Sequence, residues 1–315
     1  MKKILITGGT GSWGKILLER LLLKPTVEEV RIFSRNEYNQ VMMSRKYTDP
    51  IVKYIIGDIR DYEAVYNACR DIDTVFHLSA LKHVPICEEM PLEAIKTNIT
   101  GTECLIRACV SQGVQNAIDV STDKACSPNT LYGATKLVGE KLILNANNYG
   151  KTKFKCIRAG NVLGSAGSVV PLFIDQIRQS NIITVTDCGM TRYFMSLAEA
   201  IELLIQTIEF KEEAEMLVMK MPSCTIGDLA NAVIYKHGDA YTTIREMGMR
   251  DNEKKHELLI NTDEAMNTYV YNTHYYVISN KELKLPKVTF KEYGSNTQKL
   301  MTGTEILDML TKGGF

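Results

Sequence analysis

A glycine-rich loop near the N-terminus, with the sequence TGGTGSWG at positions 7–14, limits the folds open to this chain. It follows a short apolar run, Lys3–Thr7, and opens a segment, Lys15–Leu23, whose apolar residues recur at helical spacing. Strand, glycine turn and helix in this order form a phosphate-binding corner, because glycine lets the backbone approach a pyrophosphate. We expect the phosphates at the helix N-terminus, where N–H groups and the helix dipole favour an anion. The predicted contacts are Gly8, Thr10, Gly11, Ser12, Trp13 and Gly14.

Five more apolar runs of strand length follow the loop, and helical patterns at Pro91–Gln112 and Leu131–Asn148 lie between some of them. Strands that alternate with helices predict a parallel sheet covered on both faces, with ligands beyond the carboxyl ends of its strands. The expected fold class is α/β, a doubly wound parallel sheet of the Rossmann type. The further predicted strands are Glu29–Phe33, Val52–Ile56, Thr74–Leu78, Asn116–Val120 and Lys153–Arg158.

Beyond about residue 164 the pattern becomes irregular, which predicts a second, smaller lobe. Helical spacing returns at Val170–Arg178 and Ser196–Ile208, and a short helix is expected at Gly303–Leu310. Residues 216–261 mix short strands with one helix and contain a polar segment, Arg250–Glu257. We expect residues 1–165 to form the dinucleotide-binding domain, joined by part of the later chain. Residues 166–315 are expected to form mostly a substrate-binding lobe.

The composition excludes several functional classes. Lys plus Arg and Asp plus Glu number 37 each, so the chain has no broad electrostatic basis for binding nucleic acid or an anionic membrane. The 8 cysteines show no CxxC pair and no Cys/His spacing of a zinc site, which predicts reduced thiols and no metal. No apolar run reaches the roughly 18 residues of a membrane span, and MKKILI at the start is typical of a strand rather than a signal peptide. We expect a cytoplasmic protein.

The residues that follow the second and third predicted strands indicate which dinucleotide binds. Enzymes that use NAD usually have an acidic residue at the end of the second strand, beside the ribose 2′-hydroxyl. This chain has Ser34 and Arg35 there, a hydroxyl and a guanidinium that suit the 2′-phosphate of NADP. Asp58 and Ile59, after the third strand, are expected to border the adenine. The loop after the fourth strand, near the nicotinamide in this fold, adds Leu78, Ala80 and Lys82.

A second motif, YGATK at positions 132–136, indicates the chemistry. Tyr132 and Lys136 are four residues apart on a predicted helix, so they share a face. We expect the Lys136 ammonium to lower the pKa of the Tyr132 phenol. The phenolate can then take a proton from a substrate hydroxyl while hydride leaves the carbon for nicotinamide. Thr122, in the Ser-Thr pair that ends the preceding strand, completes the expected redox site.

Together these motifs resemble those of the extended short-chain dehydrogenase/reductases. They are most similar to the C5-inverting UDP-N-acetylglucosamine 4,6-dehydratases of pseudaminic acid and capsule sugar synthesis. The likeness extends over nearly the whole chain, through TGGTGSWG, FSRNE, LSALKHVP, NITGT, STDKACSPNTLYGATK, RAGNVLGSAGSVVP, GMTRYFMS and MRDNEKKHELL. The more specific segments are Lys82-His83-Val84-Pro85 and Thr122-Asp123-Lys124, because a generic epimerase is not expected to place Asp-Lys directly after Ser-Thr.

The resemblance implies a reaction on a UDP-amino sugar. Oxidation at C4 makes a ketone that acidifies the C5 proton; loss of this proton and of the C6 hydroxyl gives a 5,6-ene, and hydride returns at C6. Asp123 is implied as the acid at C6 and Lys124 as the carrier of the C5 proton, a division that the sequence alone leaves open. A homo-oligomer is also implied. The implied substrate-binding residues are Lys82, His83, Asn161, Val162, Arg192, Arg250 and Glu253.

Three departures from the family pattern concern the expected substrate site, and the first two lie beside the expected sugar. Ala159 and Ala166 replace a tyrosine and an arginine, and Arg250-Asp251-Asn252-Glu253 replaces Arg-Pro-Gly-Glu. These changes leave open which UDP-sugar binds and whether the enzyme catalyses only part of the sequence, the formation or conversion of the 5,6-ene. A UDP-sugar 4-epimerase and a retaining dehydratase are further alternatives. A non-catalytic NADP-binding protein is another, although such proteins tend to lose the tyrosine or the lysine.

Overall fold

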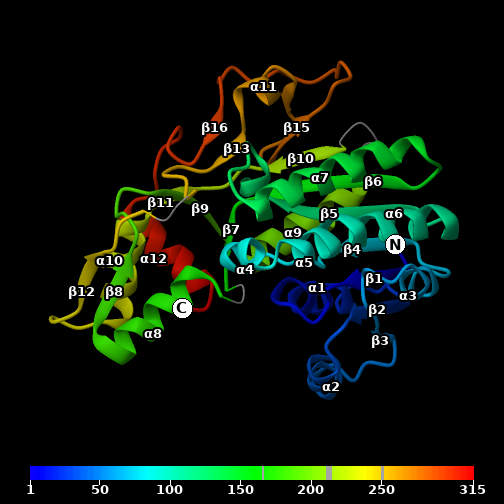
Figure 1. Ribbon diagram of the computed structural model, residues 1–315, viewed down its shortest axis with the longest axis horizontal. Helices are drawn as coiled ribbons and strands as arrows, with labels where there is room; N and C mark the ends of the chain where they lie inside the picture. Colours follow the sequence, from blue (N-terminus) through cyan, green and yellow to red (C-terminus); the bar gives the residue numbers. More distant parts are fainter. Residues whose placement is uncertain (165–166, 211–214, 250–251) are drawn as a thin grey trace.

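The computed structural model describes residues 1–164, 167–210, 215–249 and 252–315, which are built around one large sheet (Figure 1). Within these residues nine strands form the sheet, in the order β14-β15-β10-β6-β5-β4-β1-β2-β3. Strands β1 to β6 and β10 are parallel, and β15 pairs antiparallel with both of its neighbours, β10 and β14. The order 3-2-1-4-5-6 reverses between β1 and β4, as in a doubly wound dinucleotide fold, so the predicted fold class is confirmed. The strands are β1 (Lys3–Thr7), β2 (Glu29–Ser34), β3 (Val52–Ile56), β4 (Thr74–His77), β5 (Asn116–Thr122), β6 (Lys153–Ala159), β10 (Met216–Met219), β14 (Thr268–Val270) and β15 (Tyr275–Ile278).

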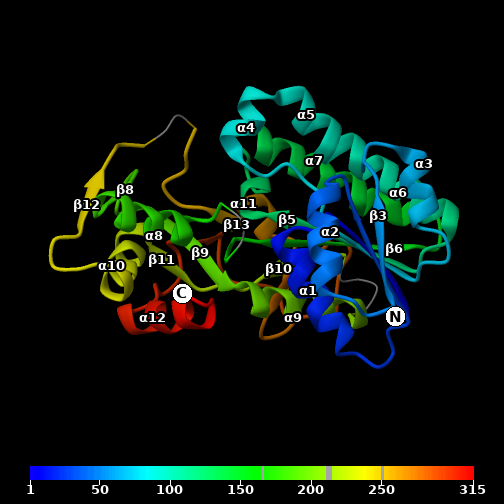
Figure 2. The ribbon, with the colours of Figure 1, turned by 90° about the horizontal axis from the view of Figure 1, so that it is seen from below.

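Alternate side chains of the central strand β1 enter two separate cores. Ile4 and Ile6 pack with helices α1 and α9 on one face of the sheet. Leu5 packs on the opposite face with α3, α6 and α7. Because both faces are covered, β1 is a continuous apolar run, and Figure 2 shows the two helical layers on opposite sides of the sheet. These helices are α1 (Ser12–Leu22), α3 (Tyr62–Ala68), α6 (Gly101–Gln112), α7 (Leu131–Asn145) and α9 (Leu197–Gln206).

In the nucleotide-binding half, three short helices lie outside the predicted elements: α2 (Glu37–Lys46), α3 and α4 (Val84–Glu89). Their apolar periodicity is weak, and α2 buries only Gln40 and Met43. A capping signal marks two of their starts, since the side chains of Asn36 and Asp61 accept hydrogen bonds from the first turns of α2 and α3. The single helix predicted at 91–112 is divided into α5 (Pro91–Ile95), a π-helical turn and α6.

The chain beyond β6 builds a third core and also returns to the large sheet. Helices α8, α10 and α12 form this core with short strands that include β7, β8, β9 and β11. The chain returns to the large sheet through α9, β10, β14 and β15, so the sequences of the two lobes are interleaved. The remaining elements are β7 (Asn161–Leu163), α8 (Val169–Ser180), β8 (Ile182–Val185), β9 (Thr191–Ser196), β11 (Ser223–Thr225), α10 (Ile226–His237), β12 (Thr243–Glu246), β13 (Leu258–Ile260), α11 (Thr262–Ala265), β16 (Tyr293–Gly294) and α12 (Gly303–Lys312).

Two absences apply to the described residues. No helix there combines the length and the apolar character that crossing a membrane requires. The His, Cys, Asp and Glu side chains of the same residues form no group of three or more that could hold a metal ion. All 8 cysteines carry free thiols.

Candidate active site

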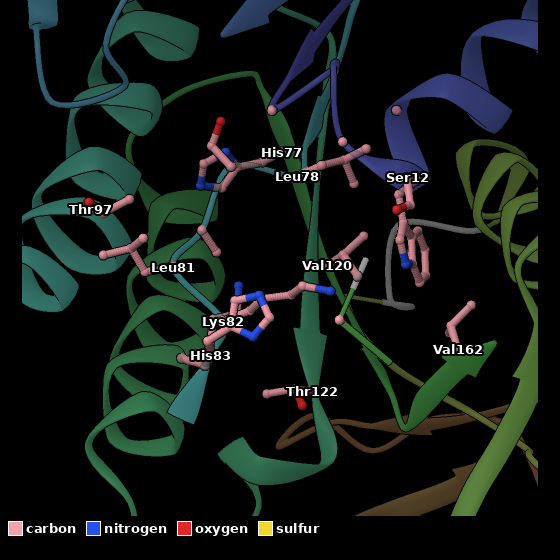
Figure 3. Close-up of a pocket in the computed structure, with 18 of the residues that line it drawn as sticks. Ser12, His77, Leu78, Leu81, Lys82, His83, Thr97, Val120, Thr122 and Val162 are labelled. Carbon is pink, nitrogen blue, oxygen red and sulfur yellow. The ribbon is translucent and has the colours of Figure 1, made fainter. Parts of the chain in front are cut away.

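A cavity of about 700 Å³ opens at the carboxyl ends of β1, β2, β4, β5 and β6, beside the reversal in strand order. Ligands of doubly wound sheets bind at this place. Figure 3 shows Ser12 at the start of α1, and Lys82 and His83 across the cavity from it. Every predicted cofactor contact except Asp58 lines the cavity: Gly8, Thr10, Gly11, Ser12, Trp13, Gly14, Ser34, Arg35, Ile59, Leu78, Ala80, Lys82, Tyr132 and Lys136.

The glycine loop leaves no space for larger side chains. Gly8 has φ +65°, and a Cβ there would lie 2.8 Å from the carbonyl carbon of Leu78. A Cβ on Gly14 would lie 2.2 Å from the carbonyl oxygen of Gly9, because the first turn of α1 packs directly on the loop. Within the described residues, no side chain caps the start of α1. The loop therefore fits a dinucleotide whose pyrophosphate lies against the N–H groups of this helix.

Next to the glycine loop, Ser34 and Arg35 line the cavity wall at the end of β2. Gln40 orients Ser34, because its amide donates to both the carbonyl and the hydroxyl oxygen of that residue. Asp58 is not a lining residue. Its carboxylate pairs with Arg60 at 2.7 Å and with the Arg35 guanidinium at 3.7 Å, so it positions Arg35.

Helix α7 carries the predicted redox pair. The Thr130 side chain caps the helix by accepting a hydrogen bond from the Gly133 N–H. A Cβ on Gly133 would lie 2.2 Å from the Lys124 carbonyl oxygen, so glycine lets α7 approach the turn that follows β5. Tyr132 and Lys136 are both buried and both line the cavity, as their spacing on one helical face predicts.

The pKa of Tyr132 is raised above its ordinary value of 10.0, opposite to the decrease expected from the sequence. Burial is the largest cause and raises the pKa, because it disfavours the phenolate. Lys136 and Lys124 both lower the pKa but do not outweigh the burial. The predicted influence of the lysine is present, and the burial that opposes it comes from tertiary packing.

Asp119, in the middle of β5, is a site residue that was not predicted from the sequence. Its carboxylate lies 3.4 and 3.5 Å from the Lys136 ammonium, and both side chains are buried. Burial is the largest single influence on the pKa of Lys136 and lowers it, but Asp119 and then Tyr132 raise it, so the net shift is upward. An acidic residue within an otherwise buried strand was the available signal, because such a group requires a partner.

His77, at the end of β4, also lines the cavity without having been predicted. Its ring shares hydrogen bonds with the Thr7 hydroxyl at 2.8 Å and the Thr102 hydroxyl at 3.2 Å. Burial lowers its pKa to about 4, with Asp119 raising it and Lys136 lowering it further. His77 is therefore neutral at neutral pH and links the start of the glycine loop to α6.

The Asp123-Lys124 pair lies in a 3-10 turn directly after β5, with Thr122 as its cap. Lys124 lines the cavity, whereas Asp123 is 0% exposed and does not. The Thr122 hydroxyl and the Lys124 ammonium both donate to the same oxygen of Asp123, Oδ1, each at 3.0 Å. Burial lowers the pKa of Lys124, but the carboxylates of Asp123 and Glu257 raise it by more, so this amine is held as an ammonium.

Four predicted substrate residues line the cavity: Lys82, His83, Asn161 and Val162. Burial lowers the pKa of Lys82. Gly167 closes the cavity against His83, because a Cβ on this glycine would lie 2.5 Å from the His83 ring. The two sides of the expected sugar pocket thus come from the loop after β4 and from the segment after β6.

The predicted roles of Arg192 and Glu253 in contacting substrate directly are not supported by their positions, since neither lines the cavity. Arg192 is 7% exposed, and its guanidinium donates to the carbonyl oxygens of Thr191, Lys254 and Lys255. Glu253 lies 3.6 Å from the same guanidinium. The sequence around an isolated arginine does not reveal that its guanidinium will donate to carbonyl oxygens of nearby segments rather than to a ligand. Arg250 and Ala166 lie outside the described residues.

Further lining residues were not among the predicted contacts, because backbone turns and packing place them at the cavity. Ala159, which the sequence placed beside the expected sugar, lines the cavity as well and is almost fully buried. Besides His77, the unpredicted lining residues are Phe33, Asn36, Ser79, Leu81, Ile86, Thr97, Val120, Ser121, Gly160, Leu163, Gly167, Ser168, Val169 and Phe194.

Comparisons with known proteins agree with this geometry. The model of a family described as polysaccharide biosynthesis protein matches residues 4–279. A Campylobacter jejuni protein named UDP-N-acetylglucosamine 4,6-dehydratase (inverting) is 43% identical over 282 residues, which cover 88% of this chain and 83% of the relative. A Rickettsia bellii protein named UDP-glucose 4-epimerase is 37% identical over 98% of this chain and 95% of its own length.

Among solved structures, the X-ray structure of Pen from Bacillus thuringiensis superposes with a TM-score of 0.93. It is 37% identical in sequence and covers 99% of this chain and 98% of its own. The chain therefore belongs to the polysaccharide biosynthesis protein family, within the extended short-chain dehydrogenase/reductases that its motifs resemble.

Proposed function

We propose that this chain is an NADP-dependent UDP-N-acetylglucosamine 4,6-dehydratase that inverts C5. Its product would be UDP-2-acetamido-2,6-dideoxy-L-arabino-hexos-4-ulose, a precursor of pseudaminic acid-type sugars. The observation that carries the proposal is that Lys124 and Tyr132 line the same cavity. A redox enzyme that only oxidises and reduces C4 needs Tyr132, and the lysine supplies the second proton-transfer group that dehydration requires.

Each step can be assigned to residues of this chain. Lys136 stabilises the phenolate form of Tyr132, which accepts the proton of the C4 hydroxyl and becomes a phenol. Lys124 exchanges the proton at C5, which the C4 ketone acidifies. Asp123 is fully buried behind Lys124 and Thr122, so we infer that it acts on the C6 leaving group through these neighbours. A bound nicotinamide supplies the hydride acceptor at C4 and the hydride donor at C6.

NADP rather than NAD is part of the proposal. Ser34 and Arg35 line the adenosine end of the cavity with a hydroxyl and a guanidinium. The acidic residue of that region, Asp58, is held by Arg60 through hydrogen bonds of 2.7 and 3.0 Å and lies away from the lining. A 2′-phosphate would therefore meet a cation, and the carboxylate beside it is already paired.

Incubation of the protein with NADP and UDP-N-acetylglucosamine in D₂O, followed by NMR, tests the function. We expect a 4-keto-6-deoxy product with deuterium at C5 and the L-arabino configuration. Conversion of a supplied UDP-sugar 5,6-ene without turnover of UDP-N-acetylglucosamine would assign the chain to the second part of the reaction. Accumulation of the 5,6-ene would assign it to the first. Turnover of a different UDP-sugar alone would refute the proposed substrate.

A UDP-sugar 4-epimerase is the second candidate, and the Rickettsia relative that matches almost the full chain favours it. An epimerase returns hydride to C4 and has no proton to move at C5. Lys124→Ala would then retain turnover of UDP-glucose to UDP-galactose, whereas a dehydratase would lose activity in the same variant. The D₂O experiment distinguishes the two as well, because an epimerase leaves C5 protonated.

We also infer a homo-oligomer. Helices α4, α5 and α7 pack against one another and expose several large apolar side chains. Such a surface is typical of a protein–protein contact. These residues are Ile86, Met90, Leu92, Ile95 and Val138. Light scattering coupled to gel filtration would give the mass, and Leu92→Lys is expected to shift it toward a monomer.

A further inference from the structure

Lys124 contacts a second carboxylate besides Asp123. Its ammonium lies 3.3 Å from an oxygen of Glu257, which precedes β13 in the C-terminal part of the chain. The side chain of Lys124 is 26% exposed toward the cavity, whereas that of Glu257 is 4% exposed and does not line it. Glu257 thus reaches the proposed proton carrier from behind the cavity wall, across 133 positions of sequence.

The segment that carries Glu257 is attached at several points to residues 123–129, which begin with the turn that contains Asp123 and Lys124. Lys254 donates to the carbonyl oxygen of Cys126 at 2.8 Å, and the Asn129 amide donates to the carbonyl oxygen of Asn252. Arg192 holds the same segment through the carbonyl oxygens of Lys254 and Lys255. The position of Glu257 relative to Lys124 is therefore fixed by backbone contacts that do not involve its own carboxylate.

The two carboxylates beside Lys124 are only partly satisfied by hydrogen bonds. One oxygen of Asp123 and one of Glu257 are buried without a hydrogen-bond partner among the described residues. The nearest other cation is Arg192, whose Nε lies 3.8 Å from Glu257. Two buried carboxylates that share one ammonium favour its charged form strongly, because an uncompensated buried charge is costly.

We propose that Glu257 is a positioning residue for Lys124: it fixes the amine at the cavity wall and, with Asp123, stabilises the ammonium that forms when the amine accepts the C5 proton. This inference rests on the proposed dehydratase function and adds a residue to it. Oxidation at C4 depends on Tyr132 and Lys136, which Glu257 does not contact. Loss of the Glu257 carboxylate should therefore affect the C5 proton and spare the C4 hydride.

The test compares Glu257→Gln with wild type in the NADP-loaded full chain. Reduced cofactor formed in a single turnover reports C4 oxidation, and deuterium uptake from D₂O reports exchange at C5. We expect C4 oxidation within about threefold of wild type and C5 exchange slower by at least about tenfold. Glu257→Asp, which keeps the charge, should recover part of the C5 rate. Equal losses in both steps, or no loss in either, would overturn the proposal.

The matched control is Asp187→Asn, which removes the ion pair of 3.2 Å with Lys255 in the same segment. This variant should retain both rates, because Asp187 does not contact Lys124. Failure of Asp187→Asn in C5 exchange alone would show that any disturbance of the segment has this effect, and would refute a specific role for Glu257.

A second measurement does not depend on the substrate. Trace acetylation with acetic anhydride, read by peptide mass spectrometry, gives the neutral-amine fraction of Lys124 as a function of pH. The groups that face this amine are Asp123, Glu257, Tyr132 and Arg192. Because Glu257 raises the pKa of Lys124, Glu257→Gln should label Lys124 about tenfold faster at alkaline pH, with exposed Lys281 as internal reference. An unchanged labelling profile would refute the proposal even if the natural substrate is not UDP-N-acetylglucosamine.

Discussion

Asp119 lies 3.4 Å from the Lys136 ammonium, and this ion pair is buried beside the cavity, one turn of helix from Tyr132. Water cannot replace either partner of the ion pair, because both side chains are less than a tenth exposed. The charge that assists Tyr132 is thus itself held in place by an acidic residue of the central sheet.

Asp119→Asn is expected to destabilise the protein. The change leaves a buried ammonium without its carboxylate, which costs about 3 kcal/mol. Chemical denaturation measures this directly. Because Asp119 raises the pKa of Lys136, the alkaline limb of the rate of C4 oxidation should also move to lower pH in the variant. The control is Glu215→Gln, which breaks the exposed pair with Lys281 and should change stability by no more than about 0.5 kcal/mol. If Asp119→Asn were as stable as Glu215→Gln, the buried ion pair of Asp119 and Lys136 would not stabilise the protein as described.

Arg35→Ala should change cofactor choice. Loss of the guanidinium beside the ribose is expected to weaken NADP binding by about 10- to 100-fold, because a charge-assisted hydrogen bond to phosphate is lost. NAD binding should stay within about twofold. Fluorescence titration of both dinucleotides measures this. Arg45→Ala removes the same charge from an exposed position that does not line the cavity, and should leave both affinities unchanged. Equal weakening of NAD and NADP by Arg35→Ala would disprove a 2′-phosphate contact.

Gly14→Ala should abolish dinucleotide binding. The added Cβ would lie 2.2 Å from the Gly9 carbonyl oxygen, so the loop or the helix must move. Calorimetric titration with NADP is expected to show a loss of affinity of at least about 100-fold, since the backbone can no longer approach the pyrophosphate. Gly303→Ala is the matched control, because an added Cβ there meets nothing within 4 Å at the start of α12. Retained affinity in Gly14→Ala would show that the loop does not hold the phosphates.

His77 should make stability depend on pH in a defined window. Its pKa is lowered from 6.5 to about 4, so below pH 6.5 the unfolded chain binds a proton that the folded protein does not. Stability is therefore present above pH 6.5 and is lost as the pH falls toward 4, by about 3 kcal/mol at most. The difference in unfolding free energy between wild type and His77→Gln should change across this window. A constant difference for His77→Gln would mean that His77 does not titrate as described.

Much of the nucleotide-binding half could be predicted, because its signals are local. The strand Lys3–Thr7, the glycines at 8, 11 and 14 and the spacing of Tyr132 and Lys136 each depend on neighbours within a few residues. Backbone conformation and helical periodicity operate over that range, so the sequence alone was sufficient for the fold class and most of the cavity lining.

Other parts of the site were decided by tertiary structure. Asp119 contacts Lys136 because β5 and α7 pack together. Glu257 contacts Lys124 because the C-terminal segment folds back onto the turn that follows β5. Arg192 was expected to bind substrate, but nearby carbonyl oxygens take up its donors. Burial also reversed the expected pKa shift of Tyr132. These outcomes depend on desolvation and on contacts between distant segments, which exist only once the chain has folded.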